Sequence, residues 1–193
     1  RKKKIAKKNK SILISYGSLD EHDLVCKTID VINNRKLDID INIIISSASK
    51  FIDKIKKYQT KNNNINLYID IKNVPEIISN SDLAIGSAGL SSLERCCLGL
   101  PSLIIETSDN QKELSKSLNK SGCAHYVGKF PDINWTQISA ILKNLLGDHK
   151  QLEIMSFRSM VNVDGHGTLR TVISLLPTYK TIAGDIINLR LVE

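Results

Sequence analysis

Short apolar runs alternate along the chain with longer stretches in which apolar and polar positions follow a helical period. Six runs have strand length, and we expect strands at residues 11–16, 40–45, 65–69, 83–85, 102–105 and 123–127. Helices are expected at residues 20–33, from residue 47 or 49 through 55, 75–80, from residues 89–91 onward, 110–120, 135–146, 151–161 and 165–175. Strands that alternate with helices and are apolar on both faces are typical of a parallel sheet covered on both sides. The expected fold class is therefore α/β, with a Rossmann-like doubly wound parallel sheet.

The stretch from Asp82 to Pro101 is the centre of this pattern. A buried strand is followed by a loop of small residues and then by a helix, and such a loop lets the backbone approach a ligand closely. Because the free amides at a helix N-terminus attract an anion, a phosphate is expected here. The candidate phosphate-binding residues are Gly86, Ser87, Gly89, Leu90, Ser91 and Ser92.

Glu94 lies about one turn into that helix, where its carboxylate can accept hydrogen bonds from a sugar attached to the phosphate. A plain alternative is a tight strand-to-helix turn, with Glu94 favoured there by the helix dipole. A second small-residue loop, Gly17-Ser18, also follows a strand. Since ligands of doubly wound sheets bind at the carboxyl ends of the strands, the two loops together favour a phosphate site at that edge.

The net charge of +7 comes from one end of the chain. Arg1 to Lys10 contains seven basic residues, and the remainder is neutral. No aromatic residues are interleaved with these charges, so we expect a solvated tail or linker and no nucleic-acid partner. The sequence shows neither a membrane-spanning stretch nor a signal peptide, which favours a cytoplasmic protein without a membrane partner.

The cysteines and histidines show no spacing typical of a metal site or of an activated nucleophile. Neither a metal nor a cofactor is therefore expected, and the cysteines are more simply interpreted as buried thiols. The cysteines and histidines are Cys26, Cys96, Cys97, Cys123, His22, His125, His149 and His166.

The domain organisation predicted from the sequence has three parts. Residues 1–10 form the basic tail or linker, residues 11–178 the Rossmann-like domain, and residues 179–193 a further linker with a terminal strand. That strand, from Asp185, has no hairpin partner in the sequence. It is either an edge strand of the sheet or the first strand of a following domain, which we favour.

The central stretch closely resembles a known enzyme family. Its pattern from Ser81 to Ser102, followed by Asp109-Asn110-Gln111, is similar to the C-terminal domain of the PseG-like UDP-sugar hydrolases of pseudaminic acid biosynthesis. Shorter segments at 14–18 and 163–167 support the resemblance, which covers about residues 11–176. The family is similar to MurG-type GT-B glycosyltransferases, so the resemblance implies the C-terminal half of a GT-B-type fold. The last six residues resemble the opening strand of a GNAT-type acetyltransferase domain.

The resemblance implies a role for each candidate residue. Backbone amides at Gly89, Leu90 and Ser91 would hold the diphosphate of a UDP-sugar, with help from Gly17 and Ser18, and Glu94 would bind the ribose. The remaining two residues, Asn110 and Gln111, would reach the sugar, with Asn110 supporting hydrolysis.

The family's catalytic histidine belongs to an N-terminal Rossmann-like half that this sequence does not contain, so the chain alone is not expected to catalyse the reaction. The expected substrate of the longer protein is UDP-2,4-diacetamido-2,4,6-trideoxy-β-L-altropyranose. A glycosyltransferase donor domain and a non-catalytic nucleotide-sugar-sensing module are the alternatives.

Overall fold

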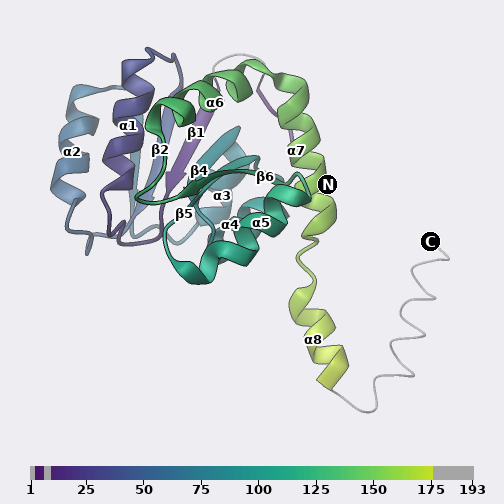
Figure 1. The fold of residues 1–193 in the computed structure, drawn as a ribbon. Coiled ribbons are helices and arrows are strands. Elements are labelled where there is room, and N and C mark those ends of the chain that lie inside the picture. The colour runs from purple at the N-terminus through teal and green to yellow at the C-terminus, as the bar shows by residue number, and fades with distance from the viewer. Residues whose placement is uncertain (1–2, 7–9, 176–193) are drawn as a thin grey trace. The chain divides into compact units, whose positions relative to one another are not determined.

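A computed structural model describes residues 3–6 and 10–175, whose centre is a parallel sheet with helices on both faces (Figure 1). Its strands are β1 Ser11–Ser15, β2 Asp40–Ile45, β3 Ile65–Ile69, β4 Leu83–Ser87, β5 Ser102–Glu106 and β6 Ala124–Lys129. The α-helices are α1 Leu24–Asn34, α2 Ile52–Lys61, α3 Val74–Asn80, α4 Leu90–Cys97, α5 Lys112–Lys120, α6 Trp135–Gly147, α7 His149–Asn162 and α8 Gly167–Leu175, and Asp109–Gln111 forms the 3-10 helix η1.

The strand order is β3-β2-β1-β4-β5-β6, and every neighbouring pair is parallel. This order reverses direction between β1 and β4, where Ser15 pairs with Gly86. The loops that leave these two strands therefore start side by side at the carboxyl edge of the sheet, which is where doubly wound folds bind ligands. The observed topology confirms the fold class predicted from the sequence.

Apolar side chains of the strands point to both faces of the sheet. On one face, Ile12 and Ile43 pack in a cluster with Ile29 of α1 and Leu142 of α6. On the other face, smaller clusters join the sheet to α3, α4 and α5. The core thus holds the strands rigidly, so that the loops at the carboxyl edge have a fixed base.

Helix α1 begins at Leu24, four residues after the expected start, with Asp23 at its N-cap position. The buried Asp20 carboxylate stabilises its first turn by accepting hydrogen bonds from the backbone amides of Leu24 and Val25, both at 2.9 Å. Helix α7 begins at His149, two residues before the expected start, and the Asp148 side chain caps it by accepting from the Gln151 amide.

Residues 3–6 pack on the sheet domain, whereas the sequence predicted a solvated tail. Ile5 is buried, and the Ala6 amide donates to the Asp82 carboxylate at 2.6 Å. The Lys3 ammonium donates to the carbonyls of Ile78 and Ser79 at the end of α3, and burial lowers the pKa of Lys3 to about 8. The sequence did not reveal this packing, because the groups that anchor the basic run, a buried carboxylate and two helix carbonyls, lie far along the chain.

The described chain divides into two units after Val163. In the second unit, Arg170 of α8 forms a bidentate ion pair with Asp164, which holds the pKa of that carboxyl below its usual range. The strand expected from Asp185 and the domain boundary after residue 178 lie outside the described residues.

Candidate functional site

Two small-residue loops meet at the carboxyl edge, as the sequence predicted. Gly86 lies so close to β1 that a Cβ there would stand 2.0 Å from the Ser15 carbonyl oxygen. Gly17 has φ +86°, a conformation that side chains with a Cβ rarely adopt. The two glycines therefore allow the close pairing of the strands and the sharp turn after β1.

The N-terminus of α4 opens onto free space. Gly89 is the N-cap residue, and a Cβ there would meet nothing within 4 Å. The next residue, Leu90, is 81% exposed. Ser92 is buried, and its hydroxyl donates to the Gly89 carbonyl at 2.6 Å, so its side chain stabilises the turn at the start of α4. Because the first amides of a helix have no partners within it, those of Leu90 and Ser91 can bind an anion.

A buried guanidinium lies beneath this loop. Arg95 is 1% exposed and donates to the Ser87 carbonyl at 2.8 Å and, more weakly, to the Ser91 hydroxyl at 3.4 Å. Its Nε has no hydrogen-bond partner, and no carboxylate among the described residues forms an ion pair with it. Burial lowers the pKa of Arg95 to about 10, so the group stays charged at neutral pH. Its positive charge therefore adds to that of the helix N-terminus.

Arg95 was not among the site residues predicted from the sequence. The available signal was its spacing from Ser92 and Cys96, which puts the three residues on one helix face, and the structure shows that this face is buried. Glu94 lies on the exposed side of the same helix, where its carboxylate is accessible to a ligand at the edge of the sheet. The structure thus separates the two neighbours, with the cation beneath the loop and the carboxylate outside it.

A cavity of about 270 Å³ lies between the loop after β1 and the loop after β5. Of the predicted site residues, Gly17, Ser18 and Gln111 line it. The candidate residues from Gly86 to Ser92 do not line it: Gly86 and Ser87 end β4, Gly89 lies in the short connection, and Leu90, Ser91 and Ser92 begin α4. His22 also lines the cavity, and the sequence analysis gave it no role.

Asn110 and Gln111 differ in what they contact. The Gln111 side-chain oxygen accepts hydrogen bonds from the backbone amide of Thr107 at 3.0 Å and from its hydroxyl at 3.2 Å. Gln111 therefore orders the loop after β5, and it is not the solvated side chain that local sequence would suggest. Asn110 is exposed, and its side-chain oxygen accepts from the Ser108 hydroxyl at 2.6 Å.

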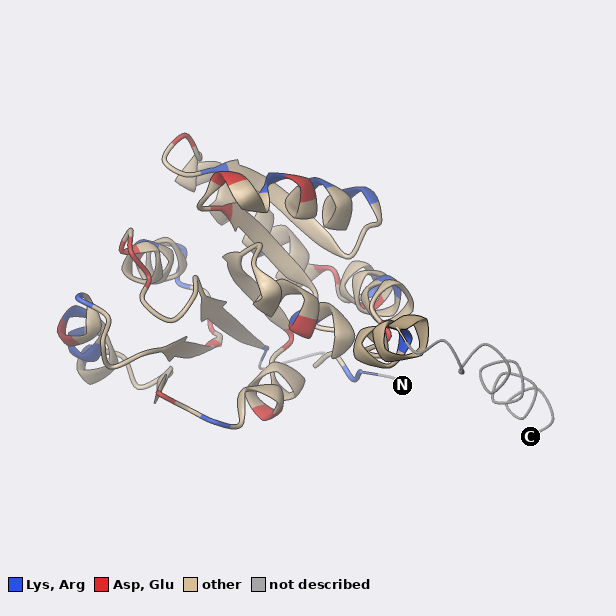
Figure 2. Cartoon of the chain, turned by 90° about the horizontal axis from the view of Figure 1, so that it is seen from below, with Lys and Arg blue, Asp and Glu red and all other residues tan. Residues whose placement is uncertain are grey.

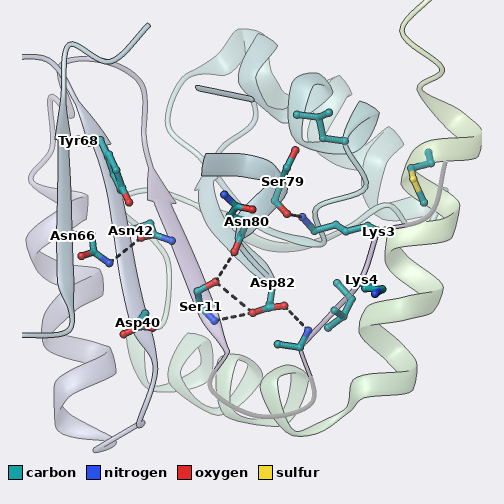
Figure 3. A pocket seen from close by; sticks show the side chains of 14 residues that line it. Lys3, Lys4, Ser11, Asp40, Asn42, Asn66, Tyr68, Ser79, Asn80 and Asp82 are labelled. Atoms are coloured by element: carbon teal, nitrogen blue, oxygen red, sulfur yellow. Dashed lines mark hydrogen bonds between the residues drawn. The ribbon is translucent and has the colours of Figure 1, made fainter. Parts of the chain in front are cut away.

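A larger cavity of about 1020 Å³ lies at the opposite, amino edge of the strands (Figure 3). Asn66 donates to Asn42, which donates to the Ser81 hydroxyl, and Asp82 accepts from the Ser11 amide. These polar groups already have partners within the chain, and some of them anchor residues 3–6. The cavity was not anticipated, because β2 and β3 were expected to be apolar on both faces; Asn42 and Asn66 within apolar runs were the overlooked signal.

Charged side chains of both signs are spread over the outer helices (Figure 2). Among the described residues, no group of histidine, cysteine, aspartate and glutamate side chains could hold a metal ion. Within the same residues, no helix combines the length and apolar character needed to cross a membrane.

No protein-family model matches the chain. One curated relative, 34% identical over 113 residues, is the UDP-N-acetylglucosamine–N-acetylmuramyl-(pentapeptide) pyrophosphoryl-undecaprenol N-acetylglucosamine transferase of Pediococcus pentosaceus; the match covers 56% of this chain and 30% of the relative. Another, 29% identical over 110 residues, is an uncharacterised protein of Methanocaldococcus jannaschii, with 55% of this chain and 23% of the relative covered.

Solved structures match over more of the chain. MurG of Acinetobacter baumannii has a TM-score of 0.69 at 19% identity and covers 86% of this chain, which spans 49% of that structure. WaaG, a glycosyltransferase of lipopolysaccharide biosynthesis, has a TM-score of 0.65 at 15% identity, with 83% and 44% covered.

At these identities the comparison shows the fold, which is that of the C-terminal Rossmann-like domain of GT-B glycosyltransferases. The chain spans less than a third of the curated relatives and about half of the solved chains.

Proposed function

We propose that this chain is the nucleotide-sugar-binding domain of a GT-B-type enzyme and that it holds the diphosphate of a UDP-sugar at the carboxyl edge of its sheet. The observation that carries the proposal is the combination of an open helix N-terminus at Gly89 with the buried guanidinium of Arg95, whose Nε has no partner and which forms no ion pair with a carboxylate of the described residues. A buried charge without a carboxylate partner is costly, and an anion at the loop would compensate it.

The roles of the remaining residues follow from their positions. The amides of Leu90 and Ser91 donate to the diphosphate, and the Gly17-Ser18 loop approaches it from β1. Glu94 binds the ribose hydroxyls. Asn110 and Gln111 are proposed to reach the sugar, for which the cavity that Gln111 lines between the β1 and β5 loops provides the space.

The proposed reaction is hydrolysis of UDP-2,4-diacetamido-2,4,6-trideoxy-β-L-altropyranose in the biosynthesis of pseudaminic acid. Water attacks the anomeric carbon, and UDP departs with the electron pair of the broken bond. A base from an N-terminal half of the cytoplasmic protein takes the proton of the water. The domain described here stabilises the charge that grows on the departing diphosphate, and only this growing part of the interaction accelerates the reaction. The support for hydrolysis is the sequence pattern from Ser81 to Gln111.

The second candidate is transfer of the sugar to an acceptor, favoured by the transferase at 34% identity. The test uses the longest natural protein that contains this chain, incubated with the UDP-diacetamido sugar and no acceptor. UDP release under these conditions supports hydrolysis, whereas release only after an acceptor is added supports transfer. Binding without turnover supports a sensing module, and failure to bind UDP contradicts the proposal.

A further inference from the structure

His22 occupies a defined position on the wall of the cavity between the β1 and β5 loops. It belongs to the β1–α1 loop and lines this cavity together with Gly17, Ser18 and Gln111. The predicted site residues on both sides of the cavity therefore share it with an imidazole that was not among the predicted site residues.

The imidazole ring is held in place by contacts that leave its nitrogens available. It stacks on the ring of Phe130, which follows β6, with centroids 4.9 Å apart and an interplanar angle of 29°. Lys27 lies over the same Phe130 ring at 4.7 Å from its centroid and donates to the His22 carbonyl at 3.2 Å. Neither ring nitrogen of His22 has a hydrogen-bond partner in the described part of the chain.

Charged groups of both signs surround the ring. Asp20 interacts with it electrostatically, although both carboxylate oxygens of Asp20 are bonded to the amides that begin α1. Glu21 and Lys50 line an adjoining cavity together with His22. The Lys27 ammonium lies over the Phe130 ring on which His22 stacks. No carboxylate of the described residues therefore forms an ion pair with the His22 ring, which leaves the ring available to a bound anion.

We propose that His22 binds the distal phosphate of the nucleoside diphosphate, the one to which the sugar is attached. This inference rests on the proposed function. The loops after β1 and β5 flank β4 in the sheet, so the cavity that His22 lines lies beside the start of α4, where the diphosphate is proposed to bind. An imidazole N–H of His22 can donate a hydrogen bond to a phosphate oxygen there.

The test compares UDP with UMP, which lacks the distal phosphate, by calorimetric titration of the full chain. The variant is His22→Phe, which keeps an aromatic ring against Phe130 but has no ring nitrogens. His125→Gln is the control, because His125 is exposed on β6 and lines neither cavity at this edge. Thermal unfolding of each variant checks that the fold is kept, and His22→Gln serves as a second variant that retains a hydrogen-bond donor.

We expect His22→Phe to weaken UDP roughly tenfold and to leave UMP binding unchanged. Equal losses for UDP and UMP, or no loss for either, would overturn the role of His22 while leaving the proposed function intact. If the wild-type chain binds neither nucleotide, both the proposed function and the role of His22 fail.

Discussion

Gly86 of β4 lies against Ser15 of β1 so closely that a Cβ at position 86 would stand 2.0 Å from the Ser15 carbonyl oxygen. The same Cβ would stand 3.2 Å from a guanidinium nitrogen of Arg95. One glycine therefore fixes the distance between the two strands whose loops form the site and also leaves room for the buried cation beneath it.

Gly86→Ala should lower the free energy of unfolding by about 3 kcal/mol, because the new methyl group can avoid the Ser15 carbonyl only if the strands separate. Gly89→Ala is the matched control. Its Cβ meets no atom within 4 Å, so its stability should fall only by the cost of alanine at a helix N-cap, about 1 kcal/mol. Chemical denaturation of both variants measures the difference, and equal losses would contradict this account of the strand pair.

Gly89→Ala should nevertheless weaken UDP, because its methyl group enters the open space in front of α4 where the diphosphate is proposed to lie. A stable Gly89→Ala protein with wild-type affinity for UDP would place the phosphates elsewhere.

Arg95→Met should reduce the affinity for UDP roughly tenfold and leave the affinity for uridine unchanged, because uridine carries no phosphate. Arg95→Lys keeps the charge and should lose less. Arg35→Met, on an exposed arginine that donates to the Ser139 hydroxyl, is the control for removing a positive charge elsewhere. Calorimetric titration gives these affinities, and wild-type affinity for UDP in Arg95→Met would show that the buried cation does not attract the anion.

Glu94→Ala should weaken UDP more than it weakens pyrophosphate, because only UDP carries the ribose that Glu94 is proposed to bind. A loss of roughly tenfold is expected for a hydrogen-bonded charged group. Glu113→Ala, which removes an exposed carboxylate from the first turn of α5, should change neither affinity. Equal losses for UDP and pyrophosphate would remove the ribose assignment.

The stability of the domain should fall at alkaline pH, in part through Cys96. Burial raises the pKa of this thiol from 9.0 to about 11, so the folded state keeps a proton that the unfolded state loses first. The stabilising contribution is complete below about pH 9 and is lost as the pH rises to about 11, by at most ~3 kcal/mol. Denaturation curves across this interval should fall less steeply for Cys96→Ala than for the wild type. A Cys96→Ala protein whose stability falls as steeply as that of the wild type would contradict this role of the thiol.

The strands and the edge that carries the candidate site could be predicted from the sequence, because apolar runs and the glycine-serine loops after β1 and β4 are local signals. The burial of Arg95 was not predicted, since a charged side chain is usually placed on the exposed side of a helix. Its partners, a strand-end carbonyl and a serine hydroxyl, become visible only when α4 is packed on the sheet.

Contacts between distant segments account for the rest of what the sequence did not reveal. The stacking of His22 on Phe130 depends on where β6 ends relative to the β1–α1 loop. The polar cavity at the amino edge depends on Asn42 and Asn66 meeting across two neighbouring strands. The two asparagines stand out within their apolar runs, but only the pairing of β2 with β3 shows that they meet.

The central claim is that UDP binds at the carboxyl edge of the sheet, and the most direct test is hydrogen–deuterium exchange of the full chain with and without UDP. The smaller cavity lies at this edge and the larger one at the amino edge, so protection by UDP distinguishes between them. We predict slower exchange at residues 17–23, 87–94 and 107–111, and no change at residues 3–6 or 79–82. ADP at the same concentration should give weaker protection. Protection confined to the amino edge, around Lys3, Asn42 and Asp82, would contradict the account, since it would place the nucleotide in the larger cavity instead.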